Sequence, residues 1–186
     1  MLRTNLSFLS FTEALYEKHP QSEDIVLTTF SKGELLLHQD GKASKVFILK
    51  EGIIKCFFRE ENGKDYILEF MSEGEIVGEI EVIKNSNCLC NVEAITAVKA
   101  YAIPVTLFRN LLEQDANFNR LILEELAERI INTSSRASSQ QLYTIEYGLR
   151  KILELQAKQD IIISKEDMAA YLGITTRSLN RALKEL

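Results

Sequence analysis

Residues 164–186 read SKEDMAAYLGITTRSLNRALKEL, and this stretch carries the sharpest pattern in the chain. Ser164 and Asp167 have the spacing of a helix start, where the hydroxyl accepts from free backbone N–H groups and the carboxylate faces the positive end of the helix. Gly173 stands where the first apolar face ends, and a left-handed turn there has no steric cost. Thr175 can cap a second helix. The stretch therefore predicts two short helices joined by a tight turn.

Two helices joined this closely are typical of the helix-turn-helix, whose second helix enters the major groove of DNA. Arg177 and Arg181 share one face of that helix, and each can donate two hydrogen bonds to a guanine. Hydroxyl and amine groups at the starts of helices can donate hydrogen bonds to DNA phosphates. The predicted DNA-binding residues are Ser164, Lys165, Thr175, Thr176, Arg177, Ser178, Asn180 and Arg181. A plain helical hairpin with a solvated arginine face is the alternative interpretation.

Composition and charge exclude several classes of function for this protein. The chain has 186 residues, is 46% hydrophobic and 26% charged, and contains 8 Gly and 2 Pro, which is typical of a globular protein. Its net charge of −5 argues against a general polyanion binder. Residues 136–186 nevertheless hold 8 basic and 6 acidic side chains, so we expect any nucleic-acid contact there. A long apolar run and a secretory signal are both missing, which predicts a cytoplasmic protein with no membrane partner.

The chain before Pro104 is rich in short runs of β-branched and aromatic residues, separated by turn-forming residues. A segment at Phe8–Lys18 has helical spacing instead. These patterns predict a short helix followed by an all-β sandwich or barrel over about 20–104. The predicted strands are Ile25–Phe30, Glu34–His38, Val46–Lys50, Ile53–Arg59, Asp65–Phe70, Val92–Thr96 and Val98–Ile103.

Beyond Val105 the apolar residues recur with the period of a helix. The longest predicted helix covers 118–141 and would measure about 36 Å, and a further helix is predicted over Tyr143–Lys158. Either a second copy of the chain or the chain's own β domain could cover an apolar stripe on the long helix. That stripe consists of Leu123, Leu126, Ile130, Thr133 and Ala137.

This order of parts resembles the cyclic-AMP receptor/fumarate-nitrate regulator (CRP/FNR) family of bacterial transcription factors. The resemblance runs from about Ile25 to Leu186 and rests on Gly33-Glu34, Val46–Gly52, Gly74–Glu79 and Ile163–Leu186. It implies an α+β fold with a cyclic-nucleotide-binding-like jelly-roll sensor domain over 1–117, a dimerisation helix over 118–141 and a helix-turn-helix DNA-binding domain over 142–186. The family's DNA-binding domain is of the winged-helix type, and we expect its two-stranded wing to be absent from this chain.

The resemblance also locates an effector pocket. Gly78 and Glu79 match the pair that binds ribose in nucleotide-binding members, but the phosphate-binding Arg-Ser positions fall near Cys88–Asn91, where no arginine stands. Burying a phosphate beside Glu79 without a cation would be costly, so we expect cyclic AMP not to bind in the usual way. A Thr-Ser pair on the long helix matches the residues that meet the adenine, or is an ordinary polar step. The predicted pocket is Gly78, Glu79, Cys88, Cys90, Asn91, Thr133 and Ser134.

No cofactor or metal is expected. The three cysteines, Cys56, Cys88 and Cys90, are fewer than the four thiolates typical of an iron–sulfur cluster. We expect them to be reduced, with Cys88 and Cys90 on one face of a strand. His19 and His38, the two histidines, have no ligand spacing.

Catalysis is not expected either. The chain lacks the common nucleophile, phosphate-loop and zinc-protease motifs. Glu79 and Glu81 are paired carboxylates at strand-like spacing, but no nearby His or Lys would separate their pKa values. We expect them to be acidic surface.

These observations predict a homodimeric transcription regulator on a two-fold symmetric site in double-stranded DNA. Its effector is unknown, and RNA polymerase is a further expected partner. The competing prediction is a sensor or dimerisation module with a jelly-roll ligand pocket that does not bind DNA.

Overall fold

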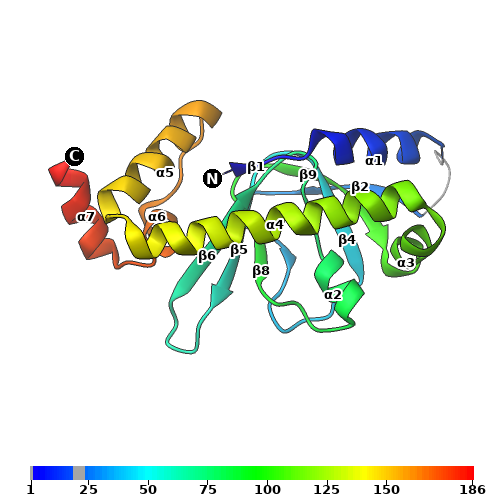
Figure 1. Ribbon diagram of the computed structural model, residues 1–186, viewed down its shortest axis with the longest axis horizontal. Helices are drawn as coiled ribbons and strands as arrows, with labels where there is room; N and C mark the ends of the chain where they lie inside the picture. The colour runs from blue at the N-terminus through cyan, green and yellow to red at the C-terminus, as the bar shows by residue number, and fades with distance from the viewer. Residues whose placement is uncertain (1, 19–23) are drawn as a thin grey trace.

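The computed structural model describes residues 2–18 and 24–186. A β-sandwich lies beside one long helix, and three shorter helices gather at one end of the molecule (Figure 1). The helices are α1 (Leu6–Lys18), α2 (Glu79–Lys84), α3 (Val105–Gln114), α4 (Ala116–Leu142), α5 (Ile145–Gln159), α6 (Lys165–Leu172) and α7 (Thr176–Glu185). Of the helices in these described ranges, none combines the length and the apolar character that crossing a membrane requires.

Two sheets form the sandwich. Within the described residues, one sheet has the order β1-β6-β5-β8-β3 and the other β2-β9-β4-β7, and every pairing except β1 with β6 is antiparallel. The strands are β1 (Leu2–Arg3), β2 (Val26–Phe30), β3 (Leu35–Leu37), β4 (Lys45–Glu51), β5 (Ile54–Arg59), β6 (Asp65–Met71), β7 (Ile76–Val77), β8 (Asn91–Ala94) and β9 (Val98–Pro104).

Apolar side chains fill the space between the sheets. Phe47 and Leu49 from one sheet pack with Ile54, Met71 and Val92 from the other, and all are buried. Alternating strand residues point to opposite faces, so each strand contributes every second side chain to this core. The sandwich interior is therefore a packed core.

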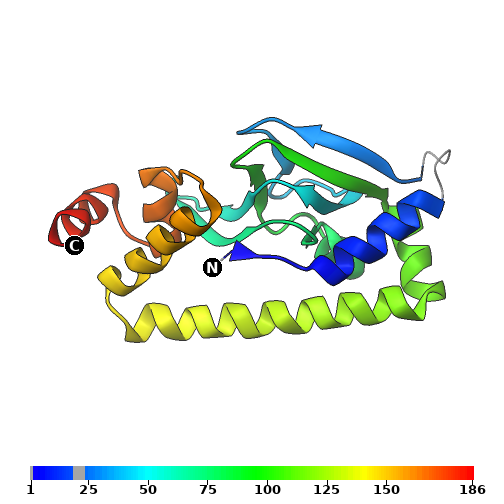
Figure 2. The same cartoon turned by 90° about the horizontal axis from the view of Figure 1, so that it is seen from above.

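The long helix α4 is bound to the sandwich along one side only. Phe118 and Ile122 of α4 pack with Phe8 of α1, Phe108 of α3 and Ile48 of β4. In Figure 2, α4 runs along one edge of the molecule, with the sandwich on its inner side and no other element of the described chain on its outer side. The outer face of α4 is thus open to solvent.

The C-terminal helices share a core with the five-stranded sheet. Phe57 and Phe70 of the sheet pack in one buried cluster with Ile152 of α5, Met168 of α6 and Leu179 of α7. This shared core places α6 against the sheet, with α7 packed on α5 and α6, rather than at the end of a free linker.

The predicted α+β class is confirmed. The predicted strands are all present with ends within two residues of those expected, and α1, α4 and α5 occupy the predicted helical segments. The domain is not all-β, because the helix α2 interrupts it. The strands β1 and β7 were not predicted, since two residues are too few to show a period. The expected domain start near residue 20 lies outside the described residues.

Two expectations about side chains are wrong. Cys56 and Cys90 form a disulfide between β5 and the loop before β8, and Cys88 in that loop is a free, buried thiol. Cys88 and Cys90 are therefore not on a strand. Glu79 and Glu81 lie on α2 and are buried, with 1% and 8% of their surface exposed. The chain enters α2 directly after Gly78. With 6 residues, α2 is too short for a helical period to be visible in the sequence.

We expect thiol labelling to report this pairing. Alkylation of air-purified protein, unfolded without reductant, should modify one cysteine, and prior reduction should raise the number to three. A Cys88→Ser control should give none before reduction and two after it. Three labels without reductant would contradict the disulfide.

Candidate nucleic-acid interface

The helix-turn-helix is formed by α6 and α7, with the capping groups that the sequence predicts. The Ser164 hydroxyl accepts from the Asp167 backbone N–H at 2.9 Å, and the Thr175 hydroxyl accepts from the Ser178 N–H at 3.2 Å. Gly173 ends α6 with a φ of 69°, in the left-handed region. Each cap satisfies a backbone group that the helix itself leaves unpaired. The two helices therefore begin and end at residues that local sequence signals specify.

The outer face of α7 is polar and exposed. Leu179 and Ala182 are buried against the rest of the domain, which turns the opposite side of the helix to solvent. Helix α7 forms one end of the molecule, away from the sandwich (Figures 1 and 2). A shallow surface hollow there is lined by Thr176, Arg177, Asn180, Arg181 and Lys184. This face presents three cations and two hydrogen-bonding groups to solvent.

Three of the predicted DNA-binding side chains, Lys165, Asn180 and Arg181, already contact other side chains of the protein. Lys165 Nζ donates to Asn180 Oδ1 at 2.9 Å, which joins the start of α6 to the middle of α7. Arg181 Nε lies 3.0 Å from Glu185 Oε1 one turn later, and the arginine side chain is 82% exposed. Exposed pairs of this kind contribute little stability, so a phosphate or a base can replace the glutamate.

The predicted stripe on α4 is mostly uncovered. Leu126 is half-buried and packs against the core under the helix, whereas Leu123 and Ile130 are 62% and 67% exposed. Thr133 and Ala137 are exposed as well. The chain's own β domain therefore covers only Leu126 of this stripe.

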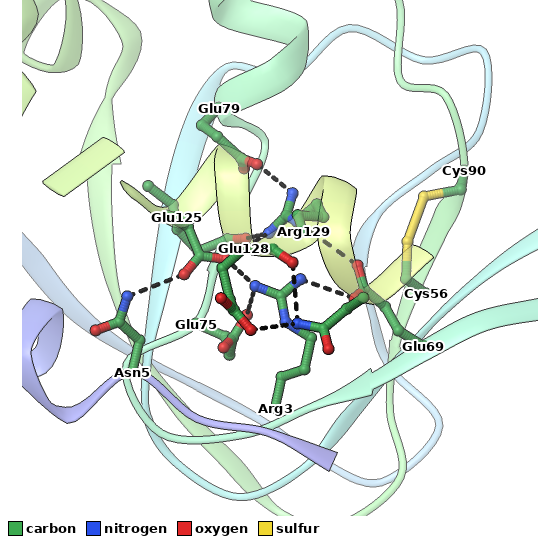
Figure 3. Close-up of polar contacts among 12 residues, drawn as sticks. Arg3, Asn5, Cys56, Glu69, Glu75, Glu79, Cys90, Glu125, Glu128 and Arg129 are labelled. Carbon is green, nitrogen blue, oxygen red and sulfur yellow. Dashed lines mark hydrogen bonds and ion pairs between the residues drawn. A yellow bond between two sulfur atoms is a disulfide. The ribbon is translucent and has the colours of Figure 1, made fainter. Parts of the chain in front are cut away.

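The region matching the effector pocket contains a buried ion pair. Gly78 has a φ of 94° and places Glu79 at the first position of α2. The Glu79 carboxylate accepts from Arg129 of α4 (Figure 3). Arg129 Nη2 also donates to the carbonyl of Ile76 at 2.9 Å. The guanidinium that α4 could offer to a ligand here is thus engaged with the sandwich.

The same ion pair belongs to a larger buried network. Arg3 of β1 pairs with Glu69 of β6 at 2.9 Å, with Glu75 at 3.0 Å and with Glu125 of α4. Arg129 lies 3.7 Å from Glu69 and 3.5 Å from Glu125. Figure 3 shows these side chains pointing toward one another from β1, β6, α2 and α4. Four carboxyl groups therefore share two guanidinium groups.

Burial and the excess of acidic groups in this network raise the pKa values of two of its carboxyl groups. Burial raises the pKa of Glu75 to about 8, and the neighbouring Glu125 adds to the rise while Arg3 and Arg129 oppose it. Burial also raises the pKa of Glu79, against the attraction of Arg129. The second carboxyl oxygen of Glu79, Oε2, is buried without a hydrogen-bond partner among the described residues. A neutral Glu75 is consequently favoured in the folded protein near pH 7.

The other predicted pocket residues are dispersed. Cys90 is in the disulfide, and the Asn91 side chain accepts from the Gln39 backbone N–H at 3.0 Å. Burial raises the pKa of the Cys88 thiol, and the nearby Glu81 adds to this effect. Thr133 and Ser134 lie on the exposed part of α4.

Potential metal ligands do not converge either. Across the ranges 2–18 and 24–186, no group of three or more His, Cys, Asp or Glu side chains is placed to hold a metal ion. His19 lies outside these ranges.

Sequence patterns offer little indication of the network residues. Arg129 and Glu125 are four residues apart on α4, a spacing that usually marks an exposed helical pair. Arg3 lies in a two-residue strand, and Glu69 and Glu75 belong to different elements that meet only in the fold. Only the tertiary structure shows that these charges are buried together.

Known proteins share both the β domain and the order of elements. The cyclic nucleotide-binding domain family matches residues 27–115. The chain is 23% identical over 162 residues to the cAMP-activated global transcriptional regulator CRP of Salmonella typhimurium, covering 81% of this chain and 77% of that protein. It is 25% identical over 159 residues to the regulatory protein YeiL of Escherichia coli O157:H7, covering 85% and 73%.

Solved structures agree with this similarity. A CRP/FNR-family transcriptional regulator from Thermus thermophilus superposes with a TM-score of 0.72 at 16% identity, covering 87% of this chain and 85% of that one. The chain therefore shares the fold of CRP/FNR-family transcriptional regulators. The c-di-GMP-responsive global regulator CLP of Xanthomonas campestris gives a TM-score of 0.77 at 14% identity, covering 97% and 91%. These two similar proteins, CRP and CLP, differ in the nucleotide to which they respond.

We expect the Glu75 carboxyl to make the stability of this protein depend on pH. Its folded-state pKa of about 8 exceeds its ordinary value of 4.5, so the folded protein binds a proton that the unfolded chain releases. The stabilisation is complete below pH 4.5 and is lost as the pH rises through 8. Between pH 5.5 and pH 8.5 this group should lose about 3 kcal/mol of stabilisation. The Tm should therefore fall by about 6–12 °C over this range, at roughly 2–4 °C for each kcal/mol.

A Glu75→Gln variant should flatten this dependence and be the more stable protein at pH 8.5. Glu60→Gln, in an exposed turn, is the matched control and should keep the wild-type slope. Thermal unfolding followed by circular dichroism at a series of pH values measures both. Equal slopes for wild type and Glu75→Gln would contradict the assignment.

Proposed function

We propose that this protein is a sequence-specific, DNA-binding transcription regulator that acts as a homodimer on a two-fold symmetric operator. The observation that carries the proposal is the exposed face of α7, which presents Arg177, Asn180 and Arg181 at the end of the molecule on a capped helix pair. Arginine and asparagine in the major groove form two-bond contacts to guanine and adenine. The caps and Lys165 would meet phosphates and fix the register.

The open face of α4 supports the dimer. Two half-sites about 34 Å apart can be read together only if two recognition helices are held at that distance. The exposed Leu123 and Ile130 give a second copy an apolar surface to cover. A parallel arrangement of two α4 helices would bring both helix-turn-helix units to the same end of the dimer. RNA polymerase is a further proposed partner, and the proposed location is the cytoplasm.

Cyclic AMP is not part of the proposed mechanism. The region between Cys88 and Asn91 offers no cation for a cyclic phosphate, and Glu79 is already paired with Arg129. Packed side chains fill the sandwich interior, which argues against the alternative of a ligand pocket there. The proposed regulator uses no metal or cofactor, and its effector is unknown.

Selection of binding sites from random double-stranded DNA tests the proposal directly. We expect an enriched sequence with two-fold symmetry and half-sites separated by one helical turn or a multiple of it. Light scattering of the same sample should give the mass of two chains. A monomer that enriches no sequence would support the non-DNA-binding module instead.

Arg181 should contribute to specificity and Lys165 to general affinity. Arg181→Ala should cost about 1–3 kcal/mol on the selected site and relax the preference at one base pair. Lys165→Ala should weaken selected and random DNA alike, because a phosphate contact is independent of sequence. Fluorescence anisotropy on both DNAs measures this, with Arg120→Ala, on exposed α4, as the control. Parallel losses on both DNAs for Arg181→Ala would contradict its role.

Titration calorimetry tests the absence of cyclic AMP binding. We expect no saturable heat up to millimolar nucleotide, since binding would bury a phosphate beside Glu79. The cAMP-activated CRP of Salmonella typhimurium is the positive control. A micromolar dissociation constant for this protein would overturn the expectation.

A further inference from the structure

Helix α6 is attached to the five-stranded sheet at two points that lie one helical turn apart. At its first turn, Lys55 Nζ of β5 donates to Asp167 Oδ1 at 2.7 Å. Lys55 also pairs with Glu93 of β8 at 3.1 Å and is 9% exposed. An ion pair this far from water is screened less than one on the surface. The first attachment therefore ties α6 to two strands of the sheet.

The second attachment joins α6 to both the sheet and the long helix. The Tyr171 ring stacks on Phe70 of β6, with the ring centroids 5.3 Å apart and an interplanar angle of 28°. The guanidinium of Arg136, from α4, lies 4.1 Å from the centroid of the Tyr171 ring. Arg136 Nη2 also donates to the Tyr171 carbonyl at 2.6 Å. A planar guanidinium can stack on a ring and donate at its edge together.

Neighbouring side chains complete this junction. Gln140 of α4 accepts from the Tyr66 hydroxyl at 2.8 Å, and its Nε2 lies 3.4 Å from the Tyr171 carbonyl. The guanidinium of Arg136 also lies 5.2 Å from the centroid of the Tyr66 ring. The C-terminal half of α4, strand β6 and helix α6 thus meet at one place.

These contacts fix the direction of the recognition helix relative to α4. Asp167 and Tyr171 are four residues apart and so lie on one face of α6. The neighbouring Met168 and Ala169 pack in the apolar core that also holds Leu179 of α7. Because α6 is held at two points and α7 packs on α6, the pair cannot turn independently of α4.

We propose that the contacts of Arg136 with Tyr171 and of Lys55 with Asp167 set the half-site spacing that the dimer accepts. This inference rests on the proposed DNA-binding function and makes Arg136 and Lys55 positioning residues. One added base pair moves a half-site by about 3.4 Å and turns it by about 35° around the DNA axis. A recognition helix fixed to α4 cannot follow such a change, whereas a released one can.

The test compares DNA duplexes that differ only in half-site spacing. Starting from the site selected by the wild-type protein, the spacing is changed by one and two base pairs in each direction, and a single half-site serves as the reference. We expect the wild type to lose about tenfold or more in affinity when two base pairs are added. Arg136→Ala should lose less than about threefold, with single half-site affinity unchanged.

Further variants separate positioning from general damage. Lys55→Met keeps the apolar stem without the charge and should relax the profile as Arg136→Ala does, which provides a second test if Arg136→Ala folds poorly. Lys99→Ala removes a charge from the exposed surface of β9 and should change nothing.

The outcomes distinguish the positioning role from the proposed DNA-binding function on which it rests. Relaxed spacing in Arg136→Ala and Lys55→Met, with single half-site binding intact, supports it. A wild-type spacing profile in both variants overturns the positioning role and leaves the DNA-binding proposal standing. A wild-type protein that selects no DNA sequence overturns both.

Discussion

The apolar core shared by the five-stranded sheet and the C-terminal helices is the constraint on which the architecture depends. Phe57 and Phe70 lie on the sheet, yet they pack in the same cluster as Ile152, Met168 and Leu179. Each buried side chain of this size stabilises the fold by about 1.5–3 kcal/mol. Separating the helix-turn-helix from the sandwich would expose this surface to water. The helix-turn-helix and the sandwich are therefore held together along this contact.

The buried charges place α4 with a specificity that apolar packing alone does not supply. Arg3 and Arg129 reach carboxyl groups on β6, α2 and α4 and on the loop before β7, so a displaced α4 would leave charges buried without partners. Such unpaired charges cost far more than a lost surface pair. The same network includes Glu79 of the predicted effector pocket, so side chains of the protein itself position the long helix there. Glu79 thus belongs both to the predicted effector pocket and to the buried network that holds α4.

Local signals predicted the fold well, and long-range pairing explains where they failed. The caps at Ser164 and Thr175 and the turn at Gly173 act within a few residues, so the sequence alone located both helices of the helix-turn-helix. The cysteine pair and the burial of Glu79 depend on neighbours far away in the chain, which no period or motif records. The wrong expectation for Glu79 arose because a carboxylate normally lies on the surface unless it is paired.

The residues of the candidate site likewise include some that local spacing predicts and others that only long-range contacts show. The outer face of α7 follows from helical spacing once the inner face is known, which is why Arg177 and Arg181 could be identified early. Arg136, Lys55 and Tyr171 gave no such signal, because their roles come from contacts across 35 to 112 positions of sequence.

The bond between Cys56 and Cys90 closes a covalent ring around β6, β7 and α2. Its sequence separation is 34 residues, and the exposed hairpin turn at residues 60–64 lies inside it. A protease that cuts this hairpin would leave both fragments joined and the sheet still paired. The nicked and intact proteins would migrate together until a reductant is added, so a regulator already cleaved in a preparation would pass as whole under oxidising conditions.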